Sequence, residues 1–112
     1  MAGINNMSDC IFCKLVHKEI PTKVVYEDDD VFVFNDISPK AEVHLLIIPK
    51  VHIESMLHLT AEHSALMGKI MILANNLAIE HGLIGGYKTQ INTGLKGGQE
   101  VFHLHVHVVG NR

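Results

Sequence analysis

The chain has 112 residues, a formal charge of −3 and a mean hydropathy of +0.21. This length predicts a single domain, and an apolar share of 47% excludes a chain that is disordered throughout. The acidic balance disfavours a broad electrostatic surface for nucleic acid, and no apolar run approaches the roughly 20 residues that a membrane span needs. We therefore expect no nucleic-acid partner, no membrane partner and a cytoplasmic location.

The domain is expected to start a few residues into the chain. Residues 1–7 show no hydrophobic periodicity and are interpreted as a leader, with Met7 as a candidate native start. Residues 8–112 are then one domain. Its first element is a short helix over residues 11–19, because apolar side chains recur on one face and Pro21 follows them.

Five strands and one long helix are predicted in the rest of the chain. The strands are expected at residues 24–27, 31–34, 43–48, 88–92 and 101–109. The third is a dense apolar run, which predicts a central strand covered on both faces. Residues 60–81 predict the long helix, with Thr60 as its N-cap and Gly82 as a left-handed C-terminal cap. This order favours an antiparallel sheet with the helices on one side, the α+β class.

Three histidines alternate with apolar residues near the C-terminus. His103, His105 and His107 share one face of the predicted strand, because successive side chains point to opposite faces. A three-histidine zinc site is one interpretation, although parallel side chains on one strand do not converge on one ion. Phosphoryl chemistry is the other, since imidazole attacks phosphorus and protonates leaving groups. The glycine-rich loop at residues 94–98 favours the second, because glycine lets backbone amides approach an anion.

A C-x-x-C pair lies at the start of the first predicted helix. One pair of cysteines is too few for a disulfide framework. The spacing of Cys10 and Cys13 is compatible with a metal site, a redox pair or two free thiols.

The H-x-H-x-H run occurs together with three recognisable segments, "IFCKLVHKEIP", "VYEDDDVFVFNDISPKAEVHLLIIPKVHI" and "INTGLKGGQEVFHLHVHVVG". With these motifs the chain resembles the histidine triad family, and within it the Hint-type branch of nucleoside phosphoramidases. Together the segments extend over most of residues 11–110. The resemblance implies a five-stranded antiparallel sheet with two helices. It also implies a homodimer that joins two sheets into one, with its contact along the long helix and residues 88–92.

The resemblance implies a role for each histidine of the site. His105 would be the nucleophile that forms a nucleotidyl-histidine intermediate. His107 would contact the α-phosphate and the leaving group. His103 would orient the strand and the neighbouring imidazoles, and His44 would support the triad from the adjacent strand.

The resemblance also implies a nucleotide site completed by His105 and His107. Asp36 would hold the ribose hydroxyls. The base and sugar would be walled by Ile11, Phe12, Phe34, Asn35 and Ile37, and the phosphate site lined by Asn92, Gly98, Gln99 and Val101. Glu100 stands where some relatives carry a serine that helps the leaving group, so a carboxylate with a negative charge replaces a hydroxyl. Relatives often continue beyond the position of Arg112 with a tail that reaches the partner subunit's site.

A structural metal site is implied by the same resemblance. Some relatives bind zinc through a cysteine pair, and the matching ligands here would be Cys10, Cys13, His52 and His103. Two thiolates and two imidazoles make a closed tetrahedral site. No cofactor is expected for catalysis itself.

The resulting prediction is a metal-independent hydrolase of purine nucleoside 5′-phosphoramidates, with an AMP or GMP type of nucleotide linked to an amine. One alternative is a module that binds AMP without relevant turnover. Another is a dinucleoside polyphosphate hydrolase. Residues 35–39 and 97–100 favour the phosphoramidase branch, and the intact His105 favours an enzyme.

Overall fold

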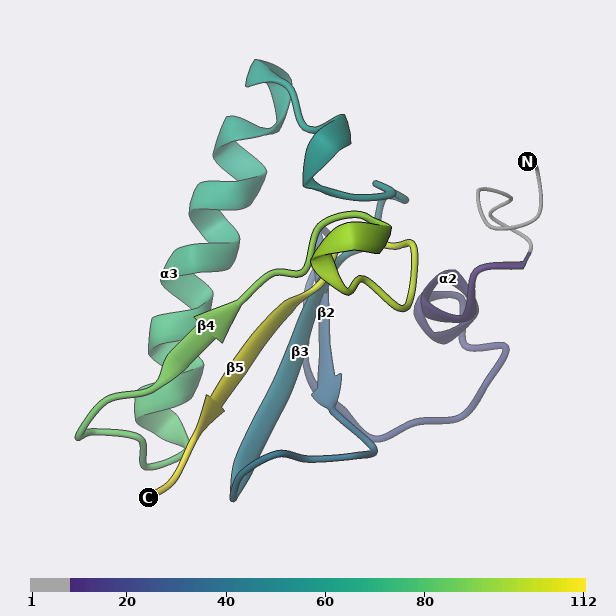
Figure 1. Cartoon of the computed structure of the whole chain (residues 1–112). Coiled ribbons are helices and arrows are strands. Elements are labelled where there is room, and N and C mark those ends of the chain that lie inside the picture. The colour runs from purple at the N-terminus through teal and green to yellow at the C-terminus, as the bar shows by residue number, and fades with distance from the viewer. Residues whose placement is uncertain (1–8) are drawn as a thin grey trace.

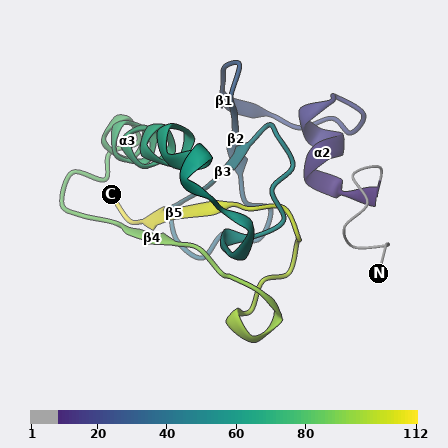
Figure 2. The same ribbon diagram turned by 90° about the horizontal axis from the view of Figure 1, so that it is seen from above.

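The computed structural model describes residues 9–112, and the leader predicted at residues 1–7 lies outside the described residues. Its helices and strands are α2 (Ile11–Val16), β1 (Val24–Glu27), β2 (Val31–Asn35), β3 (Val43–Pro49), α3 (Ser64–Glu80), β4 (Lys88–Gln90) and β5 (Val106–Gly110). The five strands form one antiparallel sheet in the order β1-β2-β3-β5-β4 (Figure 1; β1 is labelled in Figure 2). The prediction of an α+β fold with five antiparallel strands and two helices is confirmed. No helix within residues 9–112 has the length and apolar character of a membrane span.

Strand β3 is the centre of the sheet, as its apolar sequence predicts. Every one of its residues is buried, and β2 and β5 pair with its two edges. The alternation of side chains sends Val43, Leu45 and Ile47 to one face. Leu46 and Ile48 go to the other face, so the sheet has a core on each side.

The two helices cover opposite faces of the sheet, so the expectation of helices on one side is wrong. Ile70, Ala74 and Leu77 of α3 belong to the core on one face. Phe12 and Leu15 of α2 belong to the core on the other. Seen from above, strands β1 to β3 run between α3 and α2 (Figure 2). The physical reason is that β2 and β3 are apolar on both faces, and each face needs a cover.

The ends of the helices follow local backbone chemistry. Helix α2 stops at Val16, short of the predicted residue 19, and Lys18 adopts a left-handed φ of 65°. Before α3, the hydroxyl of Thr60 accepts a hydrogen bond from the N–H of Glu62, but it caps a 3₁₀ turn and the α-helix begins only at Ser64. Gly82, with a φ of 90°, follows the helix as predicted.

The last strand begins later than predicted. β5 starts at Val106, and residues 101–105 have irregular backbone. The N–H of Leu104 donates to the carbonyl of Ile53 at 2.7 Å, so this segment pairs with a loop and leaves the ladder. His103 and His105 therefore precede the strand, and the prediction that all three imidazoles stand on one regular strand is wrong. Strand β4 is likewise shorter than predicted and ends at Gln90.

Candidate active site

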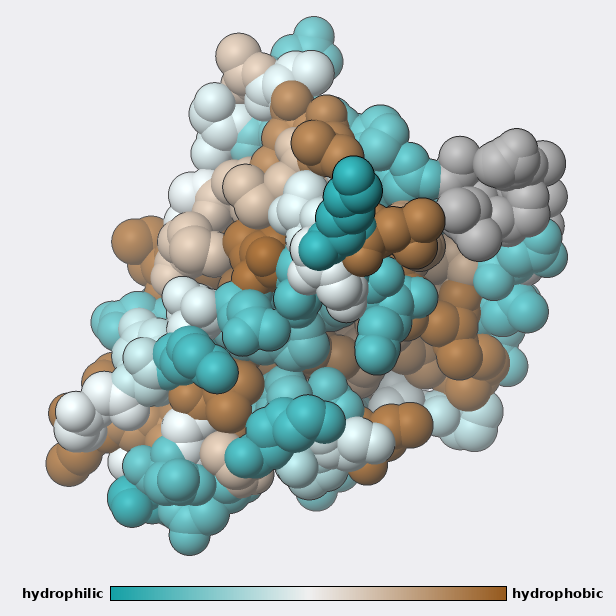
Figure 3. Space-filling view, viewed as in Figure 1, coloured by the Kyte–Doolittle hydropathy of each residue, from teal (hydrophilic) through white to brown (hydrophobic). Residues whose placement is uncertain are grey.

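A cleft with a volume of about 970 Å³ opens on the α2 side of the sheet. From the side shown in Figure 1, apolar side chains gather over α2 and polar ones gather in the middle of the view (Figure 3). The cleft lining includes most of the predicted site residues: Ile11, Phe12, Phe34, Asp36, Ile37, His44, Asn92, Gly98, Glu100, Val101, His105 and His107. Residues that lie far apart in the sequence therefore meet at one place.

Of the residues predicted for catalysis or nucleotide binding, three do not line this cleft. Asn35 lies at the exposed end of β2. Gln99 is buried and holds the glycine loop, because its Oε1 accepts from the N–H of Gly94 at 2.8 Å. Its Nε2 donates to the carbonyl of Glu54 at 2.7 Å. His103 is turned toward the cysteines.

The cleft also contains residues that sequence reasoning missed. They are Leu15, Ile20, Pro21, Thr22, Ser38, Lys40, Leu46, Lys88, Gln90 and Val109. Leu46, Gln90 and Lys88 become recognisable once the strand register is known, because they lie on the same sheet face as His107. The sequence alone does not supply that register.

His105 presents one ring nitrogen to the cleft. Its Nδ1 lies 2.8 Å from the backbone carbonyl of His103, so Nδ1 carries the proton and donates it. Its Nε2 therefore keeps a free lone pair. Burial lowers the pKa of His105, against the opposing effects of the His103 carbonyl and of the charges on Asp36 and Glu100. Phe12 packs edge-on against the ring, with centroids 5.2 Å apart.

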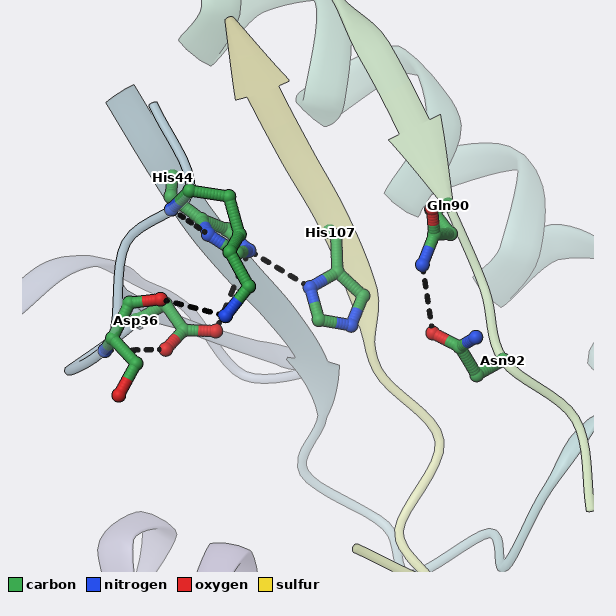
Figure 4. Close-up of polar contacts among 7 residues, drawn as sticks. Asp36, His44, Gln90, Asn92 and His107 are labelled. Atoms are coloured by element: carbon green, nitrogen blue, oxygen red, sulfur yellow. Dashed lines mark hydrogen bonds and ion pairs between the residues drawn. The ribbon is translucent and has the colours of Figure 1, made fainter. Parts of the chain in front are cut away.

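A second imidazole pair lies beside it. The backbone N–H of Lys40 donates to Nδ1 of His44 at 3.1 Å, which leaves the ring proton of His44 on Nε2. That Nε2 is 2.9 Å from Nδ1 of His107 (Figure 4). Nδ1 of His107 thus accepts, and its proton is on Nε2. Burial, followed by the charges of His105 and His44, lowers the pKa of His107 to about 4.

Asp36 supports this pair from the loop after β2. Its Oδ2 lies 3.4 Å from Nε2 of His44. Its Oδ1 accepts from the N–H of Ser38 at 2.8 Å, and its own N–H donates to the carbonyl of His44 at 2.9 Å. The carboxylate is therefore held in one orientation at the mouth of the cleft.

The glycine loop closes the other side of the cleft. Gly94 and Gly98 have φ values of 73° and 83°, a conformation that favours glycine. The side-chain amide of Asn92 donates to the carbonyl of Gly97 at 2.9 Å. In turn, Gln90 donates to Oδ1 of Asn92 at 3.0 Å (Figure 4). These bonds fix the loop against the end of β4.

A separate cluster brings together Cys10, Cys13, His52 and His103. One ligand atom from each of the four lies within 4.8 Å of the others. Nε2 of His103 donates to the carbonyl of Pro49 at 2.8 Å, so its Nδ1 lone pair faces the sulfur atoms of Cys10 and Cys13 at 3.4 and 3.5 Å.

The donor atoms of this cluster suit a metal ion. Nδ1 of His52 lies 3.2 Å from Nδ1 of His103 and 3.2 Å from the sulfur of Cys13. Burial raises the pKa of the Cys13 thiol to about 12 and lowers the pKa of His103 to about 4. Two soft sulfur atoms and two neutral imidazoles form the set that zinc prefers. A zinc site built from all three C-terminal histidines is not supported, because His103 turns to the cysteines and His107 to His44.

Comparison with known proteins agrees with this fold. The family described as scavenger mRNA decapping enzyme C-terminal binding (DcpS_C) matches residues 9–112. Protein HitA of Neisseria gonorrhoeae is 54% identical over 104 residues, which cover 93% of this chain and 97% of that protein. Purine nucleoside phosphoramidase of Escherichia coli (strain K12) is 42% identical over 105 residues, which cover 93% of this chain and 88% of that protein.

Solved structures show the same relationship. The HIT family hydrolase of Legionella pneumophila Philadelphia 1 superposes with a TM-score of 0.89 at 45% identity, covering 92% of this chain and 93% of that one. A histidine triad protein from Clostridium difficile superposes with a TM-score of 0.88 at 41% identity, covering 93% and 91%. The chain belongs to the histidine triad (HIT) family.

Proposed function

We propose that the protein hydrolyses purine nucleoside 5′-phosphoramidates, in which AMP or GMP is linked to an amine, through a covalent nucleotidyl-His105 intermediate. The observation that carries the proposal is the free Nε2 of His105 beside the protonated Nε2 of His107 in one cleft. The similarity to a purine nucleoside phosphoramidase supports the same activity.

The chemistry divides into two displacements. Nε2 of His105 attacks the phosphorus atom, and a new nitrogen–phosphorus bond forms while the bond to the amine breaks. The departing nitrogen takes the electron pair of that bond and the proton from Nε2 of His107, and it leaves as a neutral amine. The negative charge left on the His107 ring is balanced by the positive charge that the His105 ring gains, because its Nε2 is bonded to phosphorus while its Nδ1 keeps its proton. A water molecule then attacks the phosphorus, gives a proton to His107 and releases the nucleotide, which regenerates neutral His105.

The residues around the pair position the reacting groups. His44 donates to His107 and fixes its tautomer, while Asp36 holds His44 and accepts hydrogen bonds from the ribose hydroxyls. The base and sugar lie against Ile11, Phe12, Phe34 and Ile37, and the phosphate against Asn92, Gly98, Glu100 and Val101. Gln99 acts from behind the cleft lining by holding the glycine loop. His103 acts through its backbone carbonyl, which orients the ring of His105.

Cys10, Cys13, His52 and His103 are proposed to bind a structural zinc ion. Bound zinc would add folding stability by fastening α2 to the segment before β5. The residues themselves are already gathered, and the hydrogen bond from His103 to Pro49 orients its ring. Metal analysis of protein purified without chelator tests this, and about one zinc per chain is expected.

The protein is also proposed to form a homodimer through α3 and β4. Ile72 of α3 is 66% exposed and Ile84, just before β4, is 81% exposed. Within residues 9–112, all three residues of β4 are exposed, and one edge of the strand has no strand beside it. A bare edge with apolar neighbours is an aggregation hazard that pairing with a second copy removes. Light scattering at micromolar concentration should give twice the mass of the chain, and a monomer would contradict this.

A turnover assay separates the proposed activity from two other candidates. Purified protein is given AMP–amine conjugates and diadenosine polyphosphates at equal concentration. We expect release of AMP from the conjugates at a much higher kcat/KM. Preference for the polyphosphates would indicate a dinucleoside polyphosphate hydrolase, and binding of AMP without any turnover would indicate a nucleotide-binding module.

A further inference from the structure

Two lysines line the end of the cleft beyond His107. The register of β4 and β5 places Gln90 opposite His107. Two residues away from this pair on each strand, Lys88 is opposite Val109, and Val109 is opposite His44 on β3. Facing residues on neighbouring strands point to the same face of the sheet. Lys88, Val109 and His44 thus form a row next to the row that contains His107, and all of them line the cleft.

Lys40 reaches the same end of the cleft from the loop before β3. Its backbone N–H is bonded to His44, and its ammonium group lies 3.5 Å from the carbonyl of Ser38. Within residues 9–112, neither Lys40 nor Lys88 makes an ion pair, whereas Lys18, Lys50 and Lys69 each do. Lys40 and Lys88 therefore bring positive charge to the cleft without a carboxylate partner of their own.

The charges of the cleft are separated along its length. Glu100 acts on His105, where its charge opposes the effect of burial and raises the pKa. Burial is the main cause that lowers the pKa of His44; the charge of Asp36 opposes it, and the charges of Lys40 and Lys88 add to it. Asp36 lies at this end of the cleft, 3.4 Å from His44, and is already engaged by His44 and Ser38. With two ammonium groups and one carboxylate, the His44 end carries a net positive charge.

The direction of the displacement assigns an occupant to that end. Attacking and leaving atoms lie roughly in line on opposite sides of phosphorus. With His105 as the attacking group, the leaving group lies on the far side of the phosphorus, where His107 protonates it. Beyond His107 come the row of Lys88 and the side chain of Lys40, so substituents on the leaving amine extend toward two ammonium groups.

We infer that Lys88, assisted by Lys40, selects substrates whose amine leaving group carries an anionic substituent, a carboxylate or a phosphate. This inference rests on the proposed function and names the class of leaving group for the same site. The ammonium of Lys88 binds the anion when the substrate is in place, and it takes no part in the proton transfer. Lys88 is thus a specificity-determining residue.

The test compares three AMP conjugates that differ only at the end of the amine: one ends in a methyl group, one in a carboxylate and one in a phosphate. The wild-type protein should cleave the anionic conjugates with a kcat/KM about fivefold or more above that of the neutral conjugate, since a partly exposed ion pair contributes up to about 1 kcal/mol. The anionic conjugate with the higher kcat/KM shows whether the site prefers a carboxylate or a phosphate on the leaving amine. The preference should shrink as salt rises.

Three variants assign the preference to the lysine. Lys88→Gln should bring the ratio close to one, and Lys88→Arg should retain most of the preference. Lys23→Ala, which removes an exposed lysine outside the cleft, should change nothing. A ratio near one in the wild type, or a ratio that survives Lys88→Gln, overturns the inference.

A binding measurement separates this failure from a failure of the proposed function. The same three conjugates are titrated into His105→Gly protein, where no covalent step occurs, and their Kd values are compared. Preferential binding of the anionic conjugates supports the inference even if the wild type cleaves none of them, an outcome that overturns the proposed activity alone. Equal binding of all three overturns the inference, and binding of none overturns both.

Discussion

Histidine has one role in the cysteine-containing cluster and another in the cleft. The two roles differ because a different ring nitrogen is hydrogen-bonded to a backbone carbonyl in each place. His103 donates from Nε2 to Pro49, which leaves Nδ1 facing Cys10 and Cys13. His105 donates from Nδ1 to His103, which leaves Nε2 facing the cleft. A hydrogen bond to one nitrogen thus decides whether the other serves as a ligand or a nucleophile.

The largest effect is expected on turnover when His105 is replaced. His105→Gly removes the nucleophile, so turnover of AMP–amine conjugates should fall by more than about a thousandfold, the scale of loss seen when a unit of catalytic groups loses its nucleophile. AMP affinity should change by no more than about threefold, because the remaining lining is intact. Steady-state kinetics and calorimetry measure the two quantities. His58→Asn, which alters a histidine outside the cleft, serves as the control.

The next largest effect is expected in the cysteine-containing cluster. Cys13→Ser should reduce bound zinc from about one equivalent to less than about a tenth and lower the melting temperature by about 10 °C, because a structural metal contributes to folding stability. Chelation of the wild type should have the same effect on melting. The chemical step should survive in protein that stays folded. Zinc-free wild type with two freely titratable thiols would rule out the metal site.

A smaller effect is expected at the mouth of the cleft. Asp36→Ala should weaken AMP binding by about tenfold, since removal of a hydrogen-bond acceptor leaves ribose hydroxyls unpaired at a cost of roughly 1–3 kcal/mol. The 2′-deoxy analogue of AMP should lose less than AMP does on this substitution. An unchanged Kd for AMP would mean that Asp36 serves only the turn and His44.

The smallest effect is expected on the folding stability of the protein in acid, through His107. The pKa of His107 is lowered from 6.5 to about 4, with burial as the main cause. Below pH 6.5 the unfolded chain therefore binds a proton that the folded chain does not, and stability should fall as the pH drops from 6.5 toward about 4. Denaturant titrations across this range measure the slope. His107→Gln should make the slope shallower, and an identical slope in that variant would contradict the assignment.

Much of the fold was predictable because it depends on hydrophobic pattern. The run from Val43 to Ile48 is apolar at every position except His44, which predicts a strand buried on both faces, and β3 is that strand. The side on which each helix packs was not predictable by the same route. The pattern of a short helix such as α2 shows that one face is buried, but it does not show which face of the sheet receives it.

Site residues that belong to a local sequence motif were predictable. Site residues whose position depends on tertiary contacts were less so. The H-x-H-x-H run identifies the histidines, yet the strand that should carry them starts only at Val106, because Leu104 pairs with Ile53. The resemblance to relatives brought His52 and His103 together with the cysteines, and the structure gathers the four. Lys88 lacked any sequence signal, since its place in the cleft depends on the register of β4.

During turnover, His105 is expected to carry the nucleotide as a covalent adduct. Rapid quenching of the wild type with an AMP–amine conjugate, followed by mass spectrometry of the digested protein, tests this most directly. We expect one nucleotidyl group on the peptide that contains residues 103–107, located on His105 by fragmentation and absent from His105→Gly. Full turnover without any covalent adduct, or an adduct located on His103 or His107, would contradict it.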